Sequence, residues 1–388
     1  MAVSQQEEIS HTIDAFQERL PYRDLPYSRR SWGHPFHKLC SYQGKLKPSI
    51  AHWLVRLFTK EGDVVLDPLG GVGTVAFEAC AQGRLGITND LSPLAYAVAT
   101  AKVSPPGIEA CESELSNLED FVGKAELTKG DLEAAEFGLN AKVSDYFHKD
   151  TLLEILKVRK YFLDLETMSE AQAFIKANLL HIMHGNRPYA LSRTSHPITP
   201  FNPSGPFVYK PVLKKLRARV LAMLNVPLPF NFRKGKSFNF DFRALPEWVS
   251  EVDAIVTSPP FPGLRFDRPN WMRMWFCGWN ANDFHVTHKA FLESQQAKSM
   301  KVYKEFFATC TSLLRRGGIV VLHTGRTQDY SMFGDLLQYT GSELKLVGRA
   351  SESVENVENH GMSDKGTTKF HDFAFFTKAS TDREVTGP

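Results

Sequence analysis

Residues 64–74 read VVLDPLGGVGT, and this stretch decides the fold. Its apolar start is typical of a short buried strand. The glycines that follow allow a tight turn and bring the backbone close to a ligand, and a helix beginning after them offers free N–H groups. A second strand over 85–88 ends at Asn89-Asp90, and Ser92-Pro93 begins the next helix. This alternation predicts half of a doubly wound, nucleotide-binding α/β sheet.

The alternation stops after residue 104 and resumes near residue 236. Beyond that point, apolar runs predict strands over 237–240, 253–257 and 319–325, helices over 245–252 and 305–316, and a final antiparallel pair over 344–347 and 370–377. The interruption has helical periodicity, apart from an irregular segment over 186–209 that is rich in Pro, Ser, Arg and aromatic residues. We therefore expect one mostly parallel sheet with an antiparallel last strand and a largely helical insert.

Composition excludes several classes of protein. The chain has 388 residues, of which 43% are hydrophobic, but no run of about 18 apolar residues that would cross a membrane. Its start lacks the basic and apolar regions of a secretory signal. The five cysteines are scattered singly, so we expect reduced thiols in a cytoplasmic protein. His181 and His184 have no neighbouring ligands in the sequence, and we expect no metal site.

Charge is unevenly distributed although the net charge is only +3. Residues 105–150 contain 11 acidic and 4 basic side chains. Residues 171–240 contain 11 Lys or Arg and no Asp or Glu. A long basic stretch without acids is typical of a surface that binds a polyanion, so the second part of the insert is predicted to contact nucleic acid.

Two acids flank the glycine turn in the sequence. Asp67 ends the first predicted strand, and Asp90 ends the second. An acid at the second position is well placed to accept hydrogen bonds from ribose hydroxyls. The chain has neither a P-loop lysine after these glycines nor the G-x-G-x-x-G spacing, which argues against ATP and NAD as the ligand.

The octapeptide DPLGGVGT at 67–74 resembles the first motif, D-P-F-x-G-x-G-T, of the amino-methyltransferases of DNA. Leu69 and Val72 depart from the residues common in that family. The stretch YQGKLKP at 42–48 is similar to the family segment beside the methionine end of its cofactor. The resemblance implies a class I methyltransferase sheet that binds S-adenosylmethionine, with Asp90 on its ribose and Asp241 near its adenine. The implied cofactor residues are Lys47, Pro48, Asp67, Pro68, Leu69, Gly70, Gly71, Gly73, Thr74, Asp90, Leu91, Asp241 and Phe242.

The tetrapeptide Ser258-Pro259-Pro260-Phe261 follows a predicted strand, as the family motif [SDN]-P-P-[YFW] does. An exocyclic base amine is a poor nucleophile because its lone pair is delocalised into the ring. Acceptors such as the Ser258 hydroxyl and a main-chain carbonyl would hold the amine hydrogens and free that lone pair. Two prolines fix the backbone and remove their own N–H groups. Phe261 would stack on a base taken out of its helix. These four residues are the predicted catalytic site.

A serine at the first position of the tetrapeptide occurs mainly in cytosine-N4 enzymes of the resembled family. The implied function is methylation of cytosine N4 in double-stranded DNA by base flipping, within a prokaryotic restriction–modification system that has a cognate restriction endonuclease. Three alternatives stay open: adenine-N6 methylation of DNA, amino-methylation of RNA, and a non-catalytic nucleic-acid-binding protein.

The order of the motifs predicts how the chain is divided. We expect an N-terminal arm over 1–45, a cofactor-binding half over 46–104, a target-recognition insert over 105–235 and a catalytic half over 236–388. Trp271, Trp275 and Trp279 are spaced by four and favour a helix packed in the core. The candidate contacts to nucleic acid are Arg187, Arg193, Lys210, Lys214, Lys215, Arg217, Arg265 and Arg268, with Arg219 and Arg273 as further phosphate contacts.

Overall fold

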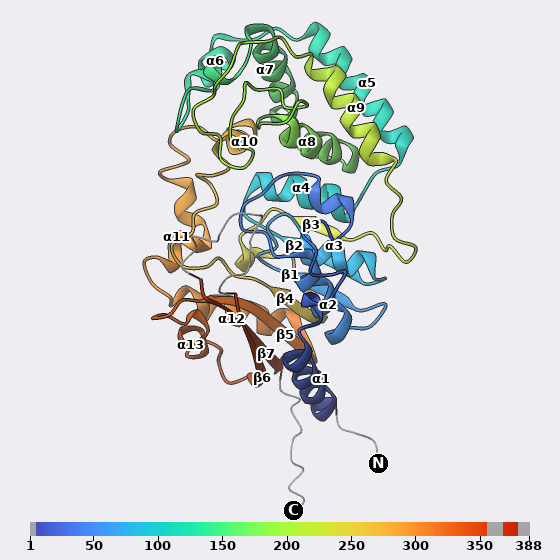
Figure 1. Ribbon diagram of the computed structural model, residues 1–388, viewed down its shortest axis with the longest axis vertical. Helices are drawn as coiled ribbons and strands as arrows, with labels where there is room; N and C mark the ends of the chain where they lie inside the picture. The colour runs from blue at the N-terminus through green and yellow to red at the C-terminus, as the bar shows by residue number, and fades with distance from the viewer. Residues whose placement is uncertain (1–4, 355–367, 379–388) are drawn as a thin grey trace, which may run out of the picture.

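A seven-stranded sheet forms the centre of the computed structural model, which describes residues 5–354 and 368–378 (Figure 1). The strand order is β3-β2-β1-β4-β5-β7-β6. The first five strands pair in parallel, and β7 lies between β5 and β6, antiparallel to both. The predicted fold class, a class I methyltransferase-like α/β sheet, is confirmed. The strands are β1 (Val64–Asp67), β2 (Leu85–Asn89), β3 (Lys236–Phe238), β4 (Val252–Thr257), β5 (Leu314–Arg326), β6 (Leu344–Ser353) and β7 (Phe370–Lys378).

Both faces of the sheet are covered because successive strand residues point to opposite sides. On β1, Val65 packs into a cluster with side chains of α1, α2 and α3, whereas Leu66 packs into the cluster that contains α12 and α13. Ala254 and Ile255 on β4 divide in the same way. The apolar runs read from the sequence therefore correspond to strands buried on both faces.

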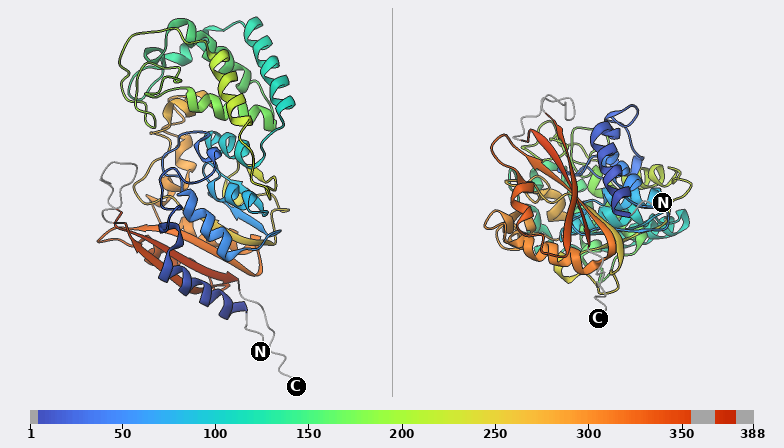
Figure 2. Two further views of the ribbon diagram at one scale, coloured as in Figure 1. Left: turned by 45° about the vertical axis from the view of Figure 1, so that its right-hand side comes forward. Right: turned by 90° about the horizontal axis from the view of Figure 1, so that it is seen from below.

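Figures 1 and 2 show helices that cover the sheet and, at one end of the molecule, the helices of the insert. α1 lies at the end opposite the insert, against β6. The helices are α1 (Gln5–Arg19), α2 (Pro48–Phe58), α3 (Thr74–Ala81), α4 (Pro93–Val103), α5 (Ile108–Lys124), α6 (Lys129–Glu133), α7 (Lys149–Leu163), α8 (Glu170–Ile182), α9 (Val212–Leu224), α10 (Trp271–Phe276), α11 (Leu292–Gln296), α12 (Val302–Leu313) and α13 (Met332–Leu337).

The insert shares one hydrophobic core with α4 and α10. α8 packs on α4, and the buried side chains of both helices belong to the cluster that also holds Trp271, Trp275 and Trp279. The prediction that these tryptophans are core residues is confirmed, since they are 0%, 1% and 7% exposed. α10 follows the predicted reaction loop in the chain, so this core connects the insert with that loop.

Three local predictions differ from the structure. The expected helix over 245–252 is a turn, where Pro246 and the positive φ of Glu251 (56°) interrupt helical geometry before β4 begins. The helix expected over 305–316 ends at Leu313, and β5 begins at once with Leu314. The arm contains α1, whose Ile13 and Phe16 are buried against the sheet. Among the described helices, none is both long and apolar enough to cross a bilayer.

We expect the Trp275→Ala substitution to lower the free energy of unfolding by about 3–5 kcal/mol, because it empties a buried aromatic site. Its indole also donates to the Ala134 carbonyl at 2.8 Å, and the Arg159 guanidinium lies 4.9 Å from its ring centroid. Urea denaturation followed by circular dichroism measures the change. Trp248→Ala, at a site that is 54% exposed, is the control and should cost clearly less. Equal losses in the two variants would contradict a shared core at α10.

Candidate functional site

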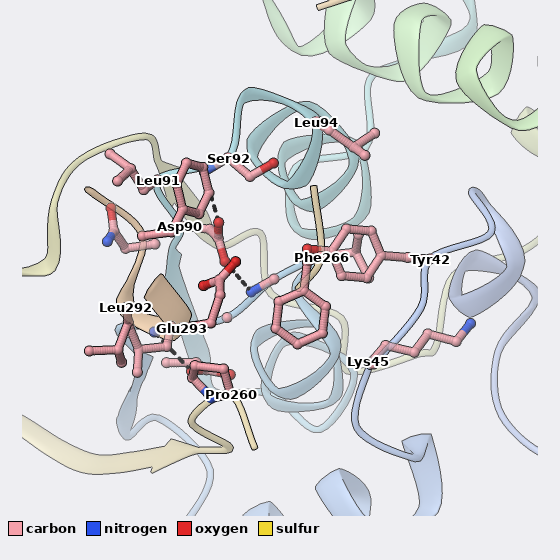
Figure 3. Close-up of a pocket in the computed structure, with 18 of the residues that line it drawn as sticks. Tyr42, Lys45, Asp90, Leu91, Ser92, Leu94, Pro260, Phe266, Leu292 and Glu293 are labelled. Atoms are coloured by element: carbon pink, nitrogen blue, oxygen red, sulfur yellow. Dashed lines mark hydrogen bonds between the residues drawn. The ribbon is translucent and has the colours of Figure 1, made fainter. Parts of the chain in front are cut away.

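A pocket lies at the carboxyl ends of β1, β2 and β4, where the strand order reverses (Figure 3). Open α/β sheets bind ligands at this position. The pocket holds about 1030 Å³, including the part open to solvent. Many of the residues predicted from the sequence line it: Asp67, Pro68, Leu69, Gly70, Gly71, Thr74, Asp90, Leu91, Asp241, Phe242, Ser258 and Pro260.

Asp90 holds the glycine turn in place. One of its carboxylate oxygens accepts a hydrogen bond from the Gly71 N–H at 2.9 Å, and the other accepts from the Ser92 N–H at 2.8 Å (Figure 3). Gly71 and Gly73 have φ values of 49° and 69°, in the left-handed region that glycine adopts without strain. The turn after β1 is thereby joined to the start of α4.

Asn89 connects the same region with the chain that follows β3. Its side-chain amide donates to the Pro68 carbonyl at 3.2 Å and to the Phe240 carbonyl at 3.0 Å, and its side-chain oxygen accepts from the Phe240 N–H at 3.0 Å. Asn89 is 1% exposed. Three loops at the end of the sheet are therefore fixed relative to one another by two adjacent side chains, Asn89 at the end of β2 and Asp90 directly after it.

The pocket is acidic. Burial raises the pKa of Asp67 to about 7 and that of Asp90 to about 6. Burial also raises the pKa of Glu293 to about 7, helped by the charges of Asp90 and Asp267. Among the described lining residues Lys45 is the one cation, and its ammonium donates to the His37 carbonyl at 2.7 Å. Such a site favours a cationic ligand and repels the phosphates of ATP or NAD.

Some predicted cofactor residues lie elsewhere. Lys47 is the N-cap of α2 and Pro48 its first residue, and neither lines the pocket, whereas Lys45 and Leu46 of the same segment do. Gly73 is the N-cap of α3, behind the lining. Asp241 lines the pocket, but both of its carboxylate oxygens accept hydrogen bonds from Arg243, at 3.0 and 2.9 Å. That ion pair occupies the carboxylate predicted near the adenine.

The predicted reaction centre opens onto the same pocket through Ser258 and Pro260. The Ser258 hydroxyl lies 3.0 Å from Nδ1 of His323 on β5. Burial and the nearby His371 keep the pKa of His323 well below its ordinary value, so its imidazole is neutral. In the neutral tautomer that carries its hydrogen on Nε2, Nδ1 accepts the Ser258 hydroxyl hydrogen, and the hydroxyl oxygen keeps its lone pairs for a ligand.

The two carbonyls of the Pro-Pro turn differ. The Pro260 carbonyl accepts from the Gln296 side-chain amide at 2.9 Å. The Pro259 carbonyl has no donor within the described ranges of the chain. Pro259 is buried and does not itself line the pocket. The turn thus offers Ser258 Oγ and one unpaired carbonyl as acceptors.

Phe261 is half-buried and packs on the sheet. A Cβ at Gly325 would lie 2.7 Å from its ring, and the His323 ring centroid is 5.8 Å away. One side of the ring is therefore covered by β5, and Phe261 is not among the pocket residues. This placement departs from the expectation of a ring free to stack on a base.

The predicted nucleic-acid contacts fall into two groups. The larger group has partners inside the protein. Arg217 forms two 2.9 Å hydrogen bonds with Glu119, and Arg265 is paired with Asp267. The others of this group bond to main-chain carbonyls: Arg193 to Gly205 and Asp145, Lys210 to Ala190 and Ser192, Lys215 to Pro188, Arg219 to Lys38, and Arg273 to Leu180, Ile198 and Pro197. In the described parts of the chain, Arg187, Lys214 and Arg268 have no such partner.

Four residues of the site were not singled out from the sequence. Tyr42 and Phe266 stack with ring centroids 6.2 Å apart and form one wall of the pocket (Figure 3). Glu293 comes from a helix of five residues and His323 from the middle of an apolar strand. Tyr42 lies in a stretch that the resemblance covers, but no local pattern marks the other three.

Comparison with known proteins identifies a methyltransferase domain in part of the chain. Residues 35–103 match a family model described as "UPF0020: RMKL-like, methyltransferase domain". No curated protein sequence matches the chain.

Three solved structures illustrate what the chain is similar to. TrmN from Thermus thermophilus is 16% identical with a TM-score of 0.35, over 92% of this chain and 54% of that one, so the chain spans about half of TrmN. A TehB-like SAM-dependent methyltransferase from Corynebacterium glutamicum is 11% identical with a TM-score of 0.32, over 95% and 99%. The rRNA methyltransferase aviRa from Streptomyces viridochromogenes is 13% identical with a TM-score of 0.31, over 88% of each chain.

The sheet order, the matched methyltransferase domain and the acidic pocket at the strand ends are features expected of an S-adenosylmethionine-dependent methyltransferase. The residues fit the cofactor, because the sulfonium and ammonium groups are cations and the pocket carries buried carboxylates. Asp90 would hold the ribose, and the glycine turn would lie under the methionine part.

We expect Asp67→Asn to stabilise the cofactor-free protein at pH 8 and to lose this advantage as the pH falls towards 4. The pKa of Asp67 is raised from 3.8 to about 7 on folding, so the stability that it contributes is present at low pH and is lost as pH rises through 7. Thermal unfolding of both proteins from pH 4 to pH 8 measures the difference. A constant difference across this range would show that Asp67 does not titrate as a buried carboxyl.

Proposed function

We propose that this protein is an S-adenosylmethionine-dependent methyltransferase that modifies an exocyclic amine of a base in an unpaired stretch of RNA. The observation that carries the proposal is the juxtaposition of Ser258 and Pro260 with the acidic cofactor pocket. The acceptor-rich turn suits an amine nucleophile, and the surface around it suits unpaired bases better than a duplex. Each step is argued below from the described residues.

At the reaction centre, acceptors of the protein would bind the hydrogens of the base amine. Ser258 Oγ, with its own hydrogen directed to His323 Nδ1, accepts one hydrogen of the amine. The Pro259 carbonyl supplies a second acceptor within the same turn. Both interactions draw the nitrogen lone pair out of conjugation with the ring. When bound, S-adenosylmethionine supplies the electrophilic methyl group. The proton that the amine releases afterwards leaves through Ser258, whose hydroxyl hydrogen is already directed at a neutral imidazole.

The irregular segment of the insert exposes aromatic rings. Phe201, Phe207 and Tyr189 are 55%, 52% and 43% exposed. The carbonyl of Pro200 accepts from the Trp271 indole at 3.2 Å, which fixes the segment to α10 just after the reaction loop. Exposed aromatic side chains stack on unpaired bases, and sequence-specific RNA recognition mostly uses single-stranded loops, bulges and ends.

Fewer of the predicted cations are available for phosphate contacts than the sequence led us to expect. Most of the predicted cations are bonded within the protein, and Arg187, Lys214 and Arg268 remain as candidates for phosphate contacts. Binding to duplex DNA depends strongly on neutralising phosphates. RNA loops present bases that are already outside a helix, so the cost of unpairing the target base is small. These two considerations favour RNA over double-stranded DNA.

The target base is proposed from the first residue of the tetrapeptide. Ser258 stands where the resembled family has serine mainly in cytosine-N4 enzymes, so cytosine N4 is the proposed acceptor and adenine N6 the alternative. Both amines would meet the same acceptors in this turn. Digestion of the methylated product to nucleosides, followed by mass spectrometry, distinguishes them.

We expect methyl transfer to structured RNA with unpaired loops and little transfer to double-stranded DNA. The measurement is incorporation of labelled methyl groups from S-adenosylmethionine into a transcribed pool of RNA hairpins with randomised loops. The matched controls are the same pool annealed to its complement and a duplex DNA pool of the same sequences. Preferential labelling of duplex DNA would restore the expectation of a DNA enzyme. No labelling of any pool, with the cofactor bound, would favour the non-catalytic alternative.

We expect Ser258→Ala to reduce the rate of methyl transfer by about 100-fold or more, because removal of one preorganised hydrogen-bonding group at a reacting atom has effects of this size. Its affinity for S-adenosylmethionine, measured by calorimetry, should change little. Thr257→Ser, a buried neighbour one residue earlier, is the control for local packing. Transfer within a few-fold of the original rate in Ser258→Ala would contradict the assigned role.

A further inference from the structure

Glu293 is a buried acid with no countercharge. It is the second residue of α11, is 8% exposed and lines the cofactor pocket. No lysine, arginine or histidine within the described ranges forms an ion pair with it. A buried carboxylate without a partner is costly, so its presence in a ligand pocket indicates that a cation completes the site.

The other acids of the pocket already have donors or partners. Asp90 accepts from two backbone N–H groups, and Asp67 accepts from the Leu69 N–H at 3.2 Å. Asp267 is paired with Arg265. Glu293 also receives backbone hydrogen bonds, from its own residue and from Phe266, but unlike Asp267 and Asp241 it has no cationic partner in the described ranges.

The position of Glu293 is fixed by the reaction loop. Gln296, one helical turn later on the same face of α11, donates to the Pro260 carbonyl at 2.9 Å. The Tyr303 hydroxyl donates to Gln296 Oε1 at 2.7 Å and holds that side chain. Figure 3 shows Glu293 between Asp90 and Pro260, and the charge of Asp90 acts on Glu293 directly.

These two neighbours mark the two ends of the reacting part of the cofactor. Asp90 is the acid assigned to the ribose, and the Ser258–Pro260 turn holds the amine that receives the methyl group. In S-adenosylmethionine the sulfonium lies between the ribose and the methyl that it carries. We propose that the Glu293 carboxylate is the countercharge of this sulfonium. The inference depends on the cofactor and not on which base is methylated.

The protonation of Glu293 follows from the same environment. Burial, Asp90 and Asp267 raise its pKa to about 7. The other titratable groups that face it are Tyr42 and Tyr303, whose pKa values are raised chiefly by burial and in smaller part by its charge. A sulfonium beside the carboxylate would lower that pKa again. Binding of S-adenosylmethionine near pH 7 should therefore release a proton.

The test compares two ligands that differ at one atom. S-adenosylhomocysteine has the same ribose, adenine and amino-acid groups, but its sulfur is a neutral thioether. Calorimetry at pH 8 gives the affinities of both ligands for the protein and for Glu293→Gln. We expect Glu293→Gln to weaken S-adenosylmethionine at least tenfold more than S-adenosylhomocysteine, a difference of about 1.4 kcal/mol.

Asp90→Asn is the matched control, because it makes the same chemical change at a group that both ligands contact. It should weaken the two ligands by the same factor. An equal loss of affinity for both ligands in Glu293→Gln would mean that Glu293 contacts a group that they share. No loss for either ligand would mean that Glu293 contacts the methyl acceptor or other parts of the protein. Either result overturns the proposal, whatever the methylated substrate is.

A measurement on the unmodified protein does not depend on any variant folding. Binding heats in two buffers of different ionisation enthalpy, at pH 7, give the number of protons released with each ligand. We expect more protons to be released with S-adenosylmethionine than with S-adenosylhomocysteine. Equal release would contradict a carboxylate whose proton is displaced by the sulfonium.

Discussion

The hydrogen bonds that Asp90 accepts are the interaction on which the site depends. The acid follows β2 directly, and its oxygens accept from the N–H of Gly71 after β1 and the N–H of Ser92 before α4. Those donors offset part of the cost of burying a carboxylate, and the cofactor is expected to supply the remainder. Without this acid the glycine turn would lose its connection to the start of α4, and Asn89 alone would hold it to β2.

The proposed role of Glu293 is a second electrostatic constraint, which would favour cofactor binding and not the rate of transfer. A countercharge at the sulfonium stabilises the bound reactant, and this stabilisation fades as the positive charge leaves sulfur during transfer. Only interactions that strengthen in the transition state accelerate the chemical step. The enzyme would thus exchange part of its maximal rate for retention of the cofactor. The proposed role of His323 is at the nucleophile, through its contact with the Ser258 hydroxyl.

The strand ends were predictable because chemistry there is tied to local sequence. Asp67, Asp90 and Ser258 each follow a short apolar run, and parallel strands bring their carboxyl ends to one edge. Glu293 and His323 reach the site through tertiary contacts that no spacing records. The expected helix over 245–252 failed because its length and Pro246 suit a turn as well as a helix.

The uneven charge of the insert is partly used inside the protein. An ion pair joins the acid-rich and acid-free parts, between Arg217 and Glu119. Arg193, Lys210 and Arg273 instead bond to main-chain carbonyls. Sequence shows how many cations a segment has, whereas only packing shows which of them are already bonded.

The buried Arg273 has a consequence for how such enzymes diversify. Its guanidinium, on α10 beside the reaction loop, binds the carbonyls of Leu180, Pro197 and Ile198 in the insert. A different insert at this position would have to supply equivalent carbonyls, or the Arg273 guanidinium would be buried without hydrogen-bond acceptors. New specificity is therefore easier to acquire by changing exposed side chains such as Phe201 than by exchanging the insert as a cassette.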